Sequence, residues 1–241
     1  MPHFKAVCAL LLAMVSLPSY SLAQNAPATG AGTASAAGKS AVFVRSVTFQ
    51  QTKLGGQVNP WNRMQVEIQA NSVLEAKPAA AAGEATKAGA NKKWVDKVKV
   101  TVTQIYKTTS AKPEDWNYYR SSATVLTIEV NQPRSVLFYL PGDIVKRDNL
   151  KKEPDYYYVQ LEVGGNEEPL FAPTGVVLPD QKMALHKDLQ TKAKFDPAKD
   201  AADRGVVSSP GILRPQYLVL YPDSPVVPSS PEFIREDVPT R

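Results

Sequence analysis

Few side chains in this chain could serve as a nucleophile, a general base or a soft metal ligand. Its 241 residues hold two His and one Cys. His186 lies between Leu185 and Lys187 with no partnered nucleophile close by in sequence, and a general base needs both a partner and an orienting group. The sequence therefore predicts a surface His186 and no catalytic site. Zinc requires more His and Cys ligands than these, so we expect no metal and no cofactor.

Acidic side chains offer a second kind of chemistry. Asp196, Asp200 and Asp203 recur at helical spacing, but carboxylates in the first turn of a helix complement its dipole. The segment also lacks the ligand pattern and central Gly of a calcium-binding loop. The adjacent pair Glu167 and Glu168 would support a hydrolase only if two carboxyl groups converged roughly 5 to 9.5 Å apart. Hydrolysis by acidic residues stays open as a third hypothesis.

The basic residues are scattered along the chain. Lys and Arg number 28 against 23 Asp and Glu, which gives a net charge of +5 with neutral His. Nucleic-acid binding favours one basic stripe interleaved with stacking aromatic rings. We therefore expect no nucleic-acid partner.

Four aromatic residues are the candidate contacts for a ligand or a partner. Trp61 follows Asn59 and Pro60, and Trp116, Tyr118 and Tyr119 lie in another polar segment. Both places are predicted to be loops. Flat rings on loops stack on sugars or anchor a partner protein, and they also fold back to cover the end of a β-sandwich.

The amino-terminal segment indicates export. Lys5 precedes an apolar run over residues 6–15, and residues 21–23 offer small side chains to a signal peptidase. We predict a signal peptide over residues 1–23 and a flexible linker over 24–40, which lacks large apolar side chains. The apolar run is shorter than the ~20 residues of a spanning helix. We expect no transmembrane span and a location in the periplasm or at the cell surface.

Hydrophobic and polar side chains alternate from about Ala41 onwards. Apolar residues occupy every second position in six runs, residues 42–49, 64–70, 98–102, 126–130, 136–140 and 157–163. This period indicates half-buried strands. Turn-rich pieces separate the runs, which favours antiparallel sheets. We predict an all-β antiparallel sandwich over residues 41–221.

Two internal segments interrupt the alternation. Residues 75–93 contain Pro and Gly and are predicted to form a loop. Residues 141–153 are predicted to form a one-turn helical crossover.

The carboxy-terminal part changes character. Short helices are expected around 181–204, with a helix opened by Asp196 and Pro197. Residues 216–221 are predicted to form a last strand. The Pro-rich tail, residues 222–241, favours an extended course.

A short motif narrows the type of sandwich. Residues 155–159 (DYYYV) resemble the corner of an immunoglobulin-type domain, where an Asp-x-Tyr-x-Cys run enters a late central strand and the Tyr hydroxyl bonds to nearby backbone. Asp155 and Tyr157 take the corner positions, and Val159 replaces the Cys. We therefore predict an immunoglobulin-like β-sandwich with one or two short helices near the C-terminus.

Over residues 41–221 the chain also resembles the immunoglobulin-like exported proteins encoded with type IV pilus genes in mucin-dwelling gut bacteria. Two stretches carry the resemblance, residues 40–49 (SAVFVRSVTF) and 137–148 (LFYLPGDIVKRD). It implies an accessory role in pilus formation or in surface contact with the host, and it assigns no role to a particular residue.

Two function classes lead. The first is a non-catalytic exported envelope protein that binds envelope or pilus-assembly proteins through exposed strand edges or the Pro-rich tail, and self-association into a homo-oligomer stays open. The alternative is a carbohydrate-binding or adhesive module that uses Trp61 and Trp116, with host glycans as ligands.

Overall fold

The computed structural model describes residues 40–54, 56–72, 93–219 and 230–234, all within one unit of the chain, residues 34–241. The predicted signal peptide, nearly all of the linker and the 75–93 loop, and most of the tail lie outside these residues. In the described part of the chain, no helix has the length and hydrophobicity to cross a membrane.

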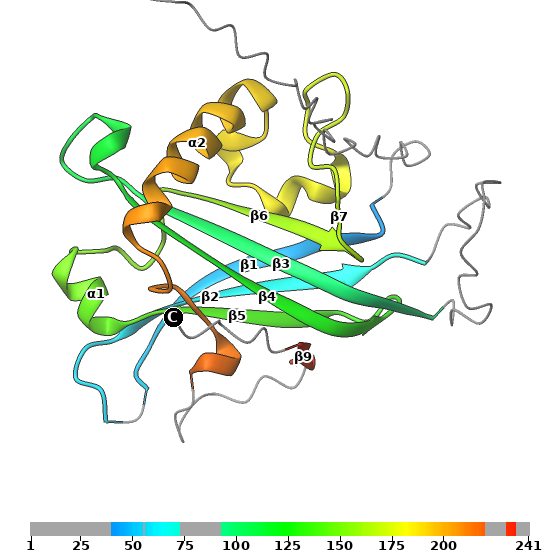
Figure 1. Cartoon of the computed structure of the whole chain (residues 1–241), viewed down its shortest axis with the longest axis horizontal. Coiled ribbons are helices and arrows are strands. Elements are labelled where there is room, and N and C mark those ends of the chain that lie inside the picture. Colours follow the sequence, from blue (N-terminus) through cyan, green and yellow to red (C-terminus); the bar gives the residue numbers. More distant parts are fainter. Residues whose placement is uncertain (1–39, 55, 73–92, 220–229, 235–241) are drawn as a thin grey trace, which may run out of the picture. The chain divides into compact units, whose positions relative to one another are not determined.

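Two antiparallel sheets make up the sandwich (Figure 1). The first sheet has the order β1-β2-β5-β8, with β1 at Val42–Thr52, β2 at Trp61–Ala70, β5 at Arg134–Leu140 and β8 at Arg214–Pro215. The second has the order β7-β6-β3-β4-β9, with β7 at Asn166–Glu167, β6 at Tyr156–Val163, β3 at Trp94–Tyr106, β4 at Asn117–Glu129 and β9 at Phe233–Ile234. The predicted all-β sandwich is confirmed.

The strand order is that of an immunoglobulin-like domain. If β1 to β7 are lettered A, B, C, C′, E, F and G in chain order, the sheets read A-B-E and G-F-C-C′. Immunoglobulin-type sandwiches place A, B and E in one sheet and C, F and G in the other. Strand G, here β7, has two residues. It therefore pairs with only the last two residues of β6, Glu162 and Val163.

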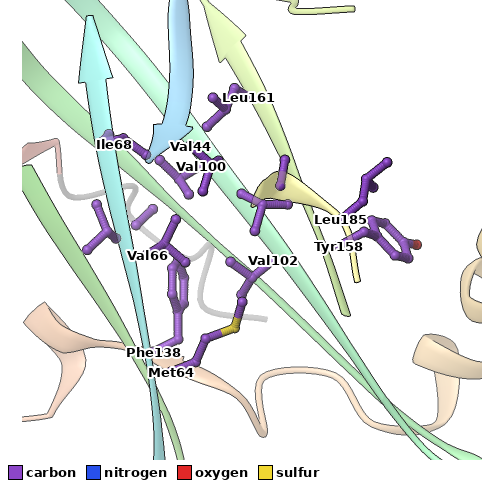
Figure 2. Packing of buried hydrophobic residues seen from close by; sticks show 14 of the residues in the cluster. Val44, Met64, Val66, Ile68, Val100, Val102, Phe138, Tyr158, Leu161 and Leu185 are labelled. Carbon is purple, nitrogen blue, oxygen red and sulfur yellow. The ribbon is translucent and has the colours of Figure 1, made fainter. Parts of the chain in front are cut away.

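The alternating residues meet between the sheets. Val44, Met64, Val66, Ile68 and Phe138 from the first sheet face Val100, Val102 and Leu161 from the second, as Figure 2 shows. All eight are at most 1% exposed. Burying a side chain of this size contributes about 1.5–3 kcal/mol, so this layer supplies the main stabilisation of the fold.

A third layer covers the outer face of the second sheet. It consists of the 3-10 helix η3 (Lys187–Leu189) and the helix α2 (Lys192–Gly205), and Figure 1 shows α2 above β6. The 3-10 helix η2 (Pro179–Ala184) packs mainly against β1 of the first sheet. Tyr158 points away from its inward neighbour Val159, yet it is fully buried. Its ring lies 5.2 Å from that of Phe195 in α2. The expectation of short helices near the C-terminus is confirmed.

Arg120 of β4 ties α2 to the sheet. One guanidinium nitrogen donates to Asp203 Oδ1 at 2.6 Å and to the Tyr158 hydroxyl at 2.6 Å. Lys199 donates to the other Asp203 oxygen at 2.7 Å. Burial raises the pKa of the Asp203 carboxyl, but these hydrogen bonds and charges outweigh it and bring the pKa below its ordinary value.

The predicted start of this helix is wrong. Asp196 and Pro197 lie inside α2, which begins at Lys192 with Thr191 before it. The backbone bond from Phe195 N to Thr191 O, 2.9 Å, already closes the first turn. Pro197 therefore removes one helical hydrogen bond without ending the helix, and Asp196 pairs with Lys192 Nζ at 2.8 Å.

The predicted strand over residues 216–221 is also wrong in its described part. Gln216–Leu218 form the 3-10 helix η5. The side chain of Gln216 replaces a neighbouring strand there, because its Oε1 accepts the backbone N–H of Leu137 at 2.8 Å.

Two of the remaining short helices, α1 (Gly142–Arg147) and the 3-10 helix η1 (Pro113–Asp115), lie next to strands, and the 3-10 helix η4 (Val206–Ser208) follows α2 directly. The helix α1 confirms the predicted helical crossover, with Val145 and Leu150 buried. In the tail, β9 pairs with Thr124 and Val125 of β4.

We expect Gly205→Ala to destabilise the protein by ~1–3 kcal/mol, the usual cost of overpacking. A Cβ at position 205 would overlap the ring of Tyr118, which is 3% exposed and held by its hydroxyl bond to Pro113 O at 2.8 Å. Urea unfolding measures the effect. Asp200→Ala on the exposed side of the same helix is the control and should stay within about 0.5 kcal/mol. Equal midpoints for the two variants would contradict this packing.

Candidate functional site

Three of the four aromatic candidates are buried inside the domain. Trp61 is the first residue of β2 and not a loop residue; it packs with Leu54, Leu137, Tyr139 and Val219. Tyr118 and Tyr119 lie in β4 and are 3% and 2% exposed. The prediction that these rings sit on loops is wrong, because the strands begin earlier than the alternation indicates.

The hydroxyl groups of the two Tyr residues bind within the domain. Tyr118 donates to Pro113 O, and Tyr119 donates to Asp148 Oδ2 at 2.5 Å. Burial raises the pKa of Tyr119, and the neighbouring Asp148 carboxylate raises it further. These two groups therefore join β4 to η1 and to the residue that follows α1.

Trp116 differs from the other three because it lies at the surface between η1 and β4. Its ring is half-buried and lines a groove of about 440 Å³ with Pro113, Tyr156, Leu189, Pro197 and Ala198. We call this the Trp116 groove. Its walls come from η1, the ends of β3, β4 and β6 that meet there, η3 and α2, so segments far apart in sequence form it.

A lysine lies against Trp116 and Tyr156, two of the three aromatic rings that line the Trp116 groove. Lys107 Nζ donates to the Tyr156 hydroxyl at 2.7 Å and lies 5.2 Å from the centre of the Trp116 ring. The hydrogen bond to Tyr156 raises the pKa of Lys107, so the ammonium is charged at neutral pH. Trp116 Nε1 donates to Ser110 O at 3.0 Å, which fixes the orientation of the indole ring.

The rim of the groove carries charges of both signs. Asp188 and Lys194 line it, and both residues are exposed. The arrangement offers an apolar, partly aromatic floor and charged groups of both signs at the edge. Such a surface suits a ligand that is apolar at its centre and polar at its ends.

The predicted corner residues have structural contacts. Asp155 Oδ2 accepts the backbone N–H of Lys107 at 2.8 Å, which closes the end of β3 beside β6. The Tyr157 ring faces the space between the sheets, 5.4 Å from Phe49. The corner is thus held by a carboxylate and a ring contact.

The acidic side chains Asp196 and Asp203 do not gather into a catalytic or metal centre. Asp196 and Asp203 are paired with Lys192, Lys199 and Arg120. Across the described ranges, no group of three or more His, Cys, Asp or Glu side chains could hold a metal ion.

His186 is not a simple surface residue, which corrects the sequence prediction. It caps η3, because its Nδ1 accepts the backbone N–H of Asp188 at 3.4 Å. Its ring lies 5.5 Å from Tyr156 and 5.8 Å from Tyr157. It therefore supports the wall of the Trp116 groove from behind Tyr156, a role that depends on residues too distant in sequence for spacing to reveal.

Comparisons with known proteins give a slight structural likeness. No protein family matches the chain, and no curated protein is similar to it in sequence. Among solved structures, a crystal structure from Akkermansia muciniphila, a mucin-dwelling gut bacterium, is similar with a TM-score of 0.42 and 10% identity. The match covers 83% of this chain and 95% of that one. A likeness of this size has no bearing on function, and the fold assignment rests on the strand pairing.

We expect stability to fall as the pH drops below about 6.5 because of His186. Burial lowers its pKa below the model-compound value of 6.5, outweighing the attraction of Asp188. The unfolded chain then binds the proton more strongly than the folded protein, so the stabilisation is complete above that pH and is lost in acid. Unfolding free energies at pH values from about 5 to 7.5 measure the slope.

His186→Asn is the matched variant for this experiment. Asn is a good N-cap that does not titrate, so the variant should show a smaller slope over the same range. A His186 imidazole that titrates at or above 6.5 by NMR would contradict the prediction.

Proposed function

We propose that this protein is a non-catalytic exported binding protein of the bacterial envelope and that the Trp116 groove holds a segment of a partner protein. The half-buried Trp116 beside Tyr156, with the Lys107 ammonium against both rings, is the observation that carries the proposal. The predicted export signal and the sequence resemblance support an envelope or pilus-assembly protein as the partner.

The chemistry of the groove favours a polypeptide ligand. Trp and Tyr in a partly enclosed pocket are the residues that most often dominate the energy of protein interfaces. Asp188 and Lys194 at the rim can pair with a partner's charged side chains, which gives specificity more than affinity. A partner segment with one or two large apolar residues between charges fits this pattern.

A carbohydrate ligand is the second candidate, because Trp116 is at the surface. Sugars stack on the flat face of an aromatic ring, but Lys107 lies over the Trp116 ring and Tyr156 approaches it at 6.3 Å. Little flat surface remains for a sugar. A hydrolytic role has less support, because Asp188 is the single carboxylate among the residues that line the groove and acid hydrolysis of glycosides uses two.

Photo-crosslinking from the groove tests the proposal. A photoreactive residue in place of Ala201, which lines the groove, should capture an exported envelope protein in cells of the native host. The same residue in place of the exposed Leu126 of β4 is the positional control. Capture from both positions, or from neither, would contradict a partner site in the groove.

With the captured partner purified, we expect Trp116→Ala to weaken binding by at least ~30-fold, the effect of losing a hot-spot residue of about 2 kcal/mol. Trp94→Ala is the matched control. Trp94 is 39% exposed and is the first residue of β3, at the end of that strand away from the Trp116 groove, which Ile105 lines. Binding of both variants to the partner is measured by calorimetry, with thermal unfolding to check the fold. The carbohydrate alternative would be favoured if no protein partner were captured, the unchanged protein bound to a glycan array, and Trp116→Ala abolished that binding.

A further inference from the structure

The start of β1 is held by two carboxylates from distant parts of the chain. The backbone N–H of Ser40 donates to Asp180 Oδ2 at 2.8 Å, and the N–H of Ala41 donates to Glu168 Oε2 at 3.1 Å. Asp180 belongs to η2 and Glu168 follows β7. Two consecutive residues that directly precede β1 thus bring two acidic side chains from distant parts of the chain to the same place. None of these four residues lines the Trp116 groove.

Three oxygen atoms at this place have no partner. Ser40 Oγ, Asp180 Oδ1 and Gln181 Oε1 are buried and make no hydrogen bond. Ser40 is 2% exposed and Gln181 is fully buried. A buried polar atom without a partner costs about 1–3 kcal/mol, so three in neighbouring residues call for a ligand.

The orientation of Gln181 is fixed by its other amide atom. Gln181 Nε2 donates to Val42 O at 3.1 Å, which leaves Oε1 as the free end of the side chain. Ser40, which carries the unpartnered hydroxyl, donates its own backbone N–H to Asp180. All three unpartnered oxygens therefore belong to residues already tied together by hydrogen bonds between η2 and the first residues of β1.

The two carboxylates also lack a positive partner. Within the described residues, neither Asp180 nor Glu168 forms an ion pair with Lys, Arg or His. A water molecule would satisfy the oxygens but would leave both negative charges uncompensated. A cation would do both.

We propose that Asp180, Glu168, Gln181 and Ser40 form a site for a hard divalent cation, with calcium as the ion that fits best. The donors are carboxylate, amide and hydroxyl oxygens, which are the ligands that calcium takes in proteins, and water molecules complete its shell of six to eight. Nitrogen and sulfur donors, which softer metals prefer, are absent from the set. This site is independent of the proposed partner site.

Calcium would stabilise the junction of three segments: the residues that lead into β1, the helix η2 and the β6–β7 hairpin. The ion would bind residues 40, 168, 180 and 181 at once, so it would join the start of β1 to η2 and to the end of the β6–β7 hairpin. Sites in extracellular modules bind calcium with Kd of about 10⁻⁴–10⁻³ M, which suits a protein predicted to be exported.

Calorimetric titration and thermal unfolding of the chelator-treated protein test the proposal. We expect one calcium per chain and a rise in Tm of about 5–10 °C at a calcium concentration about 100 times Kd. Magnesium at the same concentration should raise Tm by less than half as much, because its smaller octahedral shell fits such a site poorly.

Two kinds of variant separate binding from folding. Asp180→Asn and Glu168→Gln keep the size and the hydrogen-bond acceptor but remove a charge, and each should weaken calcium binding at least tenfold. Ser40→Ala removes an oxygen that has no partner in the calcium-free protein, so it should leave the calcium-free Tm unchanged or higher and still weaken binding several-fold. Asp196→Asn, an acid paired with Lys192 in α2, is the control and should bind within twofold of the unchanged protein.

Three results would overturn the assignment. The first is no calcium binding up to about ten times the upper Kd quoted above, which would indicate ordered water only. The second is an equal effect of magnesium, and the third is calcium binding that survives both Asp180→Asn and Glu168→Gln.

Discussion

Burial of one end of the second sheet on both faces, around Tyr158, is the constraint on which the rest of the structure depends. The inner face of the sheet packs against β1, β2 and β5, and near Tyr158 its outer face packs under α2 and η3. A sheet covered on one side alternates cleanly between apolar and polar residues, whereas a sheet covered on both sides needs apolar or aromatic residues at successive positions. The run Tyr156 to Val159 in β6 meets this need. The outer Tyr158 is therefore as buried as the inner Val159.

The Trp116 groove follows from the way the third layer meets the sheet. The helix α2 is held by Arg120 at Asp203 and by the ring of Phe195 against Tyr158. Between α2 and η1 the layer does not close, and Pro113 and Pro197 face the gap together with Trp116. Proline cannot fill such a gap with a long side chain. The opening is thus bounded by rigid residues, and Lys107 and His186 hold the wall at Tyr156.

Much of the sandwich could be predicted from the sequence, because one residue in two pointed into the core. The six alternating runs, the Asp155 corner and the α1 crossover are all local patterns. The third layer could not be anticipated in the same way, since a helix that packs on a sheet depends on contacts between residues such as Tyr158 and Phe195. The burial of Trp61 and Tyr118 was missed for the same reason: a polar neighbourhood in sequence says little about what packs over a ring.

The proposed cation site could not be predicted from the sequence, for a different reason. Ser40 and Asp180 are separated by 140 residues, and no spacing rule connects a serine at the start of a strand with a carboxylate in a 3-10 helix. In sequence, Glu168 stands beside Glu167, which suggests a pairing with that neighbour and not with Asp180. Only the meeting of β1, β7 and η2 brings them together.

The C-terminal strand gives the sandwich an edge that opens easily. The last two residues of the described tail, Phe233 and Ile234, pair with Thr124 and Val125, and Leu126 N–H donates to Glu232 O at 2.8 Å. Few backbone bonds hold β9, so it should open locally, and we expect amide hydrogens on this side of β4 to exchange with solvent sooner than those of β3, which is paired on both sides. Each such opening exposes unpaired backbone groups along β4, and an extended segment from any neighbouring chain can then take the place of the tail.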